Sequence, residues 1–136
     1  MSSLSNVIKF IPAPPDGVSS RVELIFDCEV STVVGDIVYQ DTVVQTKVIT
    51  NTDNTHVQPS LGVVIRKLSS TSCVVLTLGI HEGYTGLPIG SKVFLATDGT
   101  TTTTKPATGY VQTLGTTVSP TQIFYLPNTT RVLQTP

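Results

Sequence analysis

The chain has 136 residues, enough for one domain with a buried core but too few for a second core. Charged residues make up only 12 % and the formal net charge is −1, so we expect no nucleic-acid partner, because each neutralised phosphate requires its own Lys or Arg. Hydrophobic residues make up 39 %, which with the low net charge argues against disorder and predicts a folded chain.

The N-terminal segment, residues 1–20, is polar and proline-rich and is predicted to be an arm outside the domain. It contains the turn signal Pro15-Asp16-Gly17, because Pro fixes φ and Gly accepts a positive φ. Its apolar stretch is too short for a signal peptide, and no run reaches the roughly 20 apolar residues that span a bilayer. We therefore expect folding in a cytoplasm and no membrane partner.

From Arg21 onward, apolar and polar side chains alternate, with Val22, Leu24 and Phe26 on one face. This period of two predicts a half-buried strand. Short runs rich in Val, Ile and Thr follow, separated by Gly, Pro, Asn and Asp, which is typical of further strands. The further strands are predicted at residues 36–39, 43–49, 61–68, 73–78, 92–96, 110–114, 122–126 and 131–133.

The even spacing of these runs predicts an all-β, single-domain sandwich or barrel of jelly-roll type, with very little helix. This domain is expected to cover residues 21–127, and residues 128–136 are expected to form a C-terminal tail. Asp98-Gly99 predicts a hairpin with a type I′ turn. The following run Thr100–Thr104 is expected to be an exposed edge or loop.

No residue pattern in the chain is typical of a catalytic or metal site. His56 and His81 have no second His or Cys at metal-binding spacing, and no serine lies in a nucleophile elbow. Asp27 and Glu29 project from the same strand face, a geometry that would suit a cation or a hydrolase, but we interpret them as part of a solvated strand face. We therefore predict a protein that is not an enzyme and binds no cofactor or metal.

Cys28 and Cys73 both lie inside apolar runs, which favours buried thiols over surface disulfides or metal ligands. A disulfide between them remains an alternative if their strands are neighbours. Tyr39, Tyr84, Tyr110 and Tyr125 would suit a sugar-binding face, but the chain contains no Trp to strengthen that interpretation.

Two segments, the stretch from Phe26 to Tyr39 and the block from Pro59 to Lys67, are similar to stretches that recur in known proteins. Those proteins are small structural proteins of tailed-bacteriophage particles. Further similarity follows in order through the C-terminal half. It covers the run from Gly90 to Leu95, Gly99 with the threonine run and Pro106, the run from Gly109 to Gly115, and the run from Ile123 to Pro127.

The resemblance implies a capsid decoration (cement) protein that binds the outer capsid surface and stabilises the shell by bridging its subunits. The implied partners are the major capsid protein and further copies of the chain, as a homodimer or homotrimer, and the implied location is the virion surface. An alternative is a receptor- or glycan-binding module of a tail fibre or tail appendage, contacting its target through the tyrosines and the Gly83–Gly86 loop.

If the chain is an adhesive virion protein, its sites are interfaces rather than pockets. We expect the short apolar segments of the arm and the tail to dock on neighbouring subunits. Alternatively, they complete edge strands of their own domain. The predicted interface residues are Val7, Ile8, Phe10, Ile11, Val132 and Leu133.

Overall fold

The computed structural model describes residues 8–11 and 21–134, and this part of the chain is built from β-strands without any helix. It therefore contains no helix long enough to cross a membrane. The predicted all-β fold is confirmed. The strands are β1 (Ile8–Ile11), β2 (Arg21–Asp27), β3 (Ile37–Gln40), β4 (Val48–Thr50), β5 (Ser60–Ser69), β6 (Ser72–Glu82), β7 (Lys92–Leu95), β8 (Thr101–Thr102), β9 (Gly109–Val111), β10 (Thr113–Ser119), β11 (Gln122–Tyr125) and β12 (Val132–Gln134).

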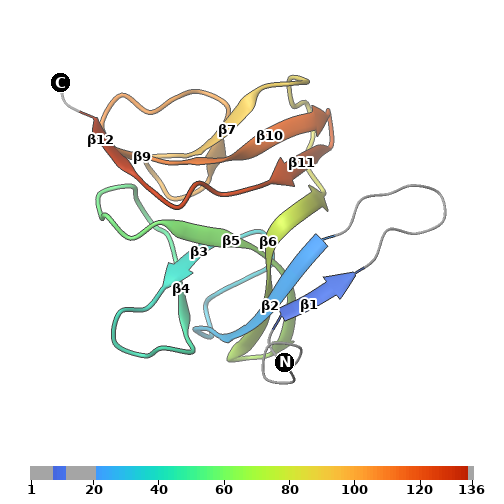
Figure 1. Cartoon of the computed structure of the whole chain (residues 1–136), viewed down its shortest axis with the longest axis vertical. Coiled ribbons are helices and arrows are strands. Elements are labelled where there is room, and N and C mark those ends of the chain that lie inside the picture. The colour runs from blue at the N-terminus through green and yellow to red at the C-terminus, as the bar shows by residue number, and fades with distance from the viewer. Residues whose placement is uncertain (1–7, 12–20, 135–136) are drawn as a thin grey trace.

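Most strands belong to one curled antiparallel sheet with the order β4-β3-β5-β6-β11-β10-β7-β8. The hairpin β1–β2 joins this sheet beside β6, and β12 pairs with β9 in a small second sheet. β1 to β4 lie in the lower half of Figure 1, and β7 and β9 to β12 lie in the upper half.

The long strand β6 belongs to both halves. Its residues 72–78 pair with β2, while its residues 79–82 pair with β11. In Figure 1 it rises from the lower half towards the upper half, so the two halves are parts of one hydrogen-bonded sheet.

Two hydrophobic clusters fill opposite faces of β5 and β6. Val63 and Leu76 point into the cluster shared with the upper half, whereas their neighbours Val64 and Val75 point into a cluster with Val38. Burial on both faces explains why these strands are continuous apolar runs instead of alternating ones.

The predicted strand at residues 43–49 is wrong at its start, because β4 begins only at Val48. Asp41 accepts a hydrogen bond from the Val43 amide at 3.0 Å, and the Lys47 amide donates to the Val44 carbonyl at 3.1 Å. These local bonds satisfy the backbone in turns, so the two valines lie in a loop despite their β propensity.

The hairpin predicted at Asp98-Gly99 is confirmed, since β7 and β8 pair on either side of it. A type I′ turn needs a positive φ at both central residues. Gly99 has a φ of +85°, but among the described residues only glycines have a positive φ, so Asp98 does not and the turn is not type I′. Asp98 instead accepts hydrogen bonds from the amide and hydroxyl of Thr100 at 3.1 and 2.6 Å.

Candidate interaction surfaces

Two loops at the lower end of the domain expose five valines. The β2–β3 loop, residues 28–36, carries Val30, Val33 and Val34, which are 71 %, 56 % and 53 % exposed. The β3–β4 loop, residues 41–47, carries Val43 and Val44, which are 84 % and 45 % exposed. We treat these exposed apolar side chains as a candidate contact surface. We call these two segments the valine loops.

A single lysine side chain, that of Lys67, holds the backbone of the β2–β3 loop in place by hydrogen bonds. The Lys67 ammonium group donates to the carbonyl oxygens of Glu29 at 3.2 Å, Thr32 at 2.8 Å and Ser70 at 3.0 Å. An ammonium group has three protons, so all three find an acceptor. This arrangement fixes the course of the loop that carries Val30.

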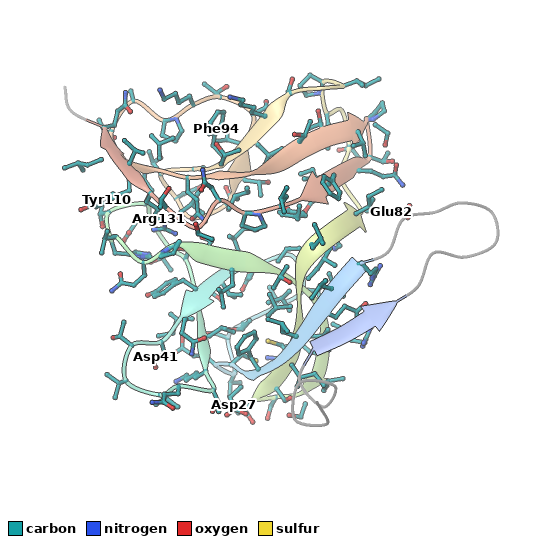
Figure 2. The ribbon with its side chains drawn as sticks, in the orientation of Figure 1. Asp27, Asp41, Glu82, Phe94, Tyr110 and Arg131 are labelled. Carbon is teal, nitrogen blue, oxygen red and sulfur yellow. The ribbon has the colours of Figure 1, made fainter. Side chains whose placement is uncertain are left out.

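Further hydrogen bonds fix the β2–β3 loop to β4 and the β3–β4 loop to the end of β2. The Asp36 carboxylate accepts from the Val33 amide and the Thr50 hydroxyl, both at 3.0 Å. The Asp27 carboxylate accepts from the Thr46 hydroxyl at 2.7 Å. Figure 2 shows Asp27 and Asp41 at the same end of the molecule. Because the loops are already ordered, a partner would bind them with little loss of conformational entropy.

A second feature is a buried polar cluster around Arg131, which is only 8 % exposed. Its guanidinium group donates to Gln112 Oε1 at 2.9 Å, the His56 carbonyl at 2.9 Å, Asn51 Oδ1 at 3.1 Å and Ser60 Oγ at 2.8 Å. Among the described residues, no buried side-chain nitrogen or oxygen lacks a hydrogen-bond partner. The cluster therefore joins the start of β12 to segments far away in the sequence.

The Arg131 cluster has an unusual charge balance, because its acceptors are neutral amide, hydroxyl and carbonyl oxygens. Burial lowers the pKa of Arg131 to about 10, which leaves the side chain positively charged at neutral pH. Burial lowers the pKa of His56 below its ordinary value, and the Arg131 charge lowers it further. Folding therefore favours the neutral form of His56 over the protonated form.

β12 carries two of the predicted interface residues, Val132 and Leu133, which are 64 % and 56 % exposed. The strand pairs with β9 of its own chain, so it completes a sheet and still exposes both side chains. Ile8, Phe10 and Ile11 lie in β1, which pairs with β2, and Val7 lies outside the described residues. That these residues contact neighbouring subunits stays a prediction.

The outer face of the upper half is hollowed into a groove of about 280 Å³, which we call the lysine groove. Phe94, Val111 and Val132 give it apolar walls, and Lys92 and Lys105 give it positive charge. The rest of its lining is hydroxyl and amide side chains, without any carboxylate.

The predicted titratable candidates lie apart from one another and have local structural partners. Asp27 is bound to Thr46, and His56 contacts Asn51 and Gln58 at 3.0 and 3.1 Å. Within residues 8–11 and 21–134, no group of three or more His, Cys, Asp or Glu side chains is placed to hold a metal ion.

His81 belongs to a hydrogen-bonded chain with two tyrosines. Its Nδ1 lies 2.9 Å from the Tyr84 hydroxyl, which lies 2.5 Å from the Tyr125 hydroxyl. Burial raises the pKa of both tyrosines and lowers the pKa of His81, so all three side chains are neutral near pH 7. Tyr125 is fully buried and Tyr84 packs against the core, so these two tyrosines do not form the open sugar-binding face considered from the sequence.

The interpretation of the two cysteines as buried thiols is confirmed. Cys28 and Cys73 belong to the same hydrophobic cluster, and both are free. Burial raises the pKa of Cys73 to about 12, so its thiol stays protonated at physiological pH.

No known protein family, curated protein or solved structure matches this chain. The virion function inferred from the sequence resemblance therefore stays a prediction. The sequence reasoning did not identify the valine loops or the Arg131 cluster. An arginine in an otherwise uncharged tail was the one available signal for the cluster, since a lone charge there needs acceptors from elsewhere in the fold.

Proposed function

We propose that this protein is a non-enzymatic structural component of a tailed-phage particle, acting as a capsid decoration protein. In this role the β2–β3 loop docks on the outer surface of the major capsid protein. The observation that carries the proposal is a loop that exposes Val30, Val33 and Val34 while Lys67 holds its backbone in place. The sequence resemblance to virion proteins supports the same role.

The chemistry of the loop suits adhesion. Burying a valine side chain completely contributes about 1.5 kcal/mol or more, and a valine loses little side-chain entropy because its χ1 angle is already restricted. Three such side chains on one braced loop would provide a modest contact per copy. Many copies on a lattice would add these contacts together and resist rupture of the shell collectively.

The test is binding of the purified protein to particles that lack it. Val30→Thr with Val33→Thr keeps the shape of both side chains but replaces one methyl group of each with a hydroxyl. We expect particle binding to weaken about 10-fold or more, since two desolvated hydroxyls without partners would cost at least about 1.4 kcal/mol together. Unchanged binding would exclude this loop as the contact.

A matched control is Val118→Thr, which alters a valine that is 43 % exposed on β10 in the other half of the domain. This variant should bind like the wild-type protein. Particles that carry the protein should also withstand heat or osmotic shock better than particles without it.

Copy number separates the capsid role from the alternative of a receptor- or glycan-binding tail module. Quantitative mass spectrometry of purified particles should find hundreds of copies for a decoration protein. A few tens of copies or fewer would instead favour the tail, and a glycan array would then be the next measurement.

A further inference from the structure

The two ends of the domain carry features that complement each other. The β3–β4 loop projects Val43 and Val44 from the lower end, whereas the lysine groove lies on the outer face of the upper half. Figure 2 shows Asp41, at the start of this loop, and Phe94, in the groove, in opposite halves of the molecule. We propose that copies of this protein associate head to tail, with the β3–β4 loop of one copy seated in the lysine groove of the next.

The projecting β3–β4 loop, residues 41–47, is held rigid by its own hydrogen bonds, and we call it the knob. Its ends are joined because the Asp41 amide donates to the Lys47 carbonyl at 2.9 Å, and the Gln40 side chain donates to the carbonyls of Gln45 and Lys47. Its most projecting side chain, Val43, is 84 % exposed, more than any other large hydrophobic residue described. An ordered apolar tip of this kind needs no rearrangement to enter a groove.

The groove suits this tip in both polarity and charge. Phe94, Val111 and Val132 offer apolar surface for the two valines. Lys92 and Lys105 add two positive charges to the groove. The end of the domain from which the β3–β4 loop projects carries the carboxylates of Asp27, Glu29, Asp36 and Asp41 against the ammonium groups of only Lys47 and Lys67, so its net charge is negative. The groove, at about 280 Å³, lies at the lower limit of the usual range for small-molecule sites, about 300–1,000 Å³.

The two surfaces differ, so the contact is heterologous and repeats from copy to copy as an open chain or a closed ring. One loop in one groove buries less than the roughly 800 Å² per partner of a standard interface, so association in solution is weak. Salt screens the attraction between exposed charges, so the association also weakens at high salt. The contact leaves the β2–β3 loop free, so it does not depend on the proposed capsid contact.

Sedimentation velocity on the purified protein tests this association. From about 10 μM to 1 mM protein at low salt, the average mass of the wild-type protein should rise well above that of a monomer, and 0.5 M salt should reduce it. A knob variant, Val43→Ser with Val44→Ser, and a groove variant, Lys92→Glu with Lys105→Glu, should each stay monomeric. All these positions are exposed, so circular dichroism and urea midpoints should match the wild-type protein.

Mixing the two variants gives the decisive result. The groove variant keeps an intact knob and the knob variant keeps an intact groove, so an equimolar mixture should form a dimer that grows no further. The control Val118→Ser should associate like the wild-type protein. A monomeric wild-type protein at 1 mM, a knob variant that still associates, or a monomeric mixture would each overturn the proposal. Binding of a poly-glutamate peptide to a monomeric wild-type protein would assign the groove to an acidic partner instead.

Discussion

Replacing Arg131 by methionine tests whether the buried polar cluster holds the two halves of the domain together. The substitution keeps an unbranched apolar stem but removes donors to Gln112, His56, Asn51 and Ser60. A hydrogen bond from a charged donor contributes about 1.5–3 kcal/mol, so four of them amount to roughly 6–12 kcal/mol before any offset.

Two effects reduce this sum. Folding the wild-type chain removes the guanidinium group from water, which costs several kcal/mol, and methionine avoids that cost. Three of the four acceptors also keep another donor, since Asn51 Oδ1 still contacts His56, Gln112 Oε1 still accepts from the Ser60 amide, and Ser60 Oγ still accepts from Asn51 Nδ2. We therefore expect Arg131→Met to lower the free energy of unfolding by about 3–5 kcal/mol, a Tm decrease of roughly 10–17 °C for a chain of this size.

Urea unfolding followed by circular dichroism, together with calorimetry, measures this change. The control is Arg66→Met, because the Arg66 side chain is 52 % exposed and lies 3.6 Å from the Glu23 carboxylate. The Glu23 side chain is buried, but it keeps its closer ion pair with Arg21 at 2.7 Å, so loss of the exposed Arg66 guanidinium should lower the unfolding free energy by less than about 1 kcal/mol. If Arg131→Met were as stable as Arg66→Met, the Arg131 cluster would not stabilise the fold.

Three further predictions concern the loop brace, the histidines and the thiols. Lys67→Met should speed amide hydrogen exchange in the β2–β3 loop by about 10-fold, because the variant has no ammonium group to bind the three carbonyls. Equal exchange rates in the variant and the wild-type protein would show that Lys67 does not hold the loop in place. Folding lowers the pKa values of His56 and His81, so below about pH 6.5 the unfolded chain binds more protons than the folded one. The urea midpoint should therefore fall as the pH falls from 7 to 5, and it should fall less in His56→Gln. A urea midpoint that does not change with pH would refute this. Cys28 and Cys73 should not react with a thiol reagent at pH 8 in the native protein but should both react in urea, and rapid native labelling would show that they are accessible.

The sequence predicted the fold well where a strand has one or two buried faces. Alternation from Arg21 and the apolar run at Cys73 identified β2 and β6 because side-chain period and burial leave a direct trace in the order of residues. The same reasoning failed at Val43, where β propensity favoured a strand but the Asp41 carboxylate provides a turn.

The candidate surfaces were harder to predict because they arise from contacts between distant segments. Lys67 meets the Glu29 carbonyl across 38 residues, and Arg131 meets Asn51 across 80 residues. A local pattern carries no trace of such pairings. The exposure of Val30 is equally invisible in the sequence, since a valine in a β-rich chain is expected to be buried.

The continuity of β6 has a mechanical consequence. Because this one strand is hydrogen-bonded to β2 and β5 in the lower half and to β11 in the upper half, tension applied between the ends of the domain passes along a single backbone. The hydrogen bonds between β6 and its neighbouring strands are then loaded in shear and together, instead of breaking one after another. Stretching the domain therefore loads the hydrogen bonds of both halves at once through β6.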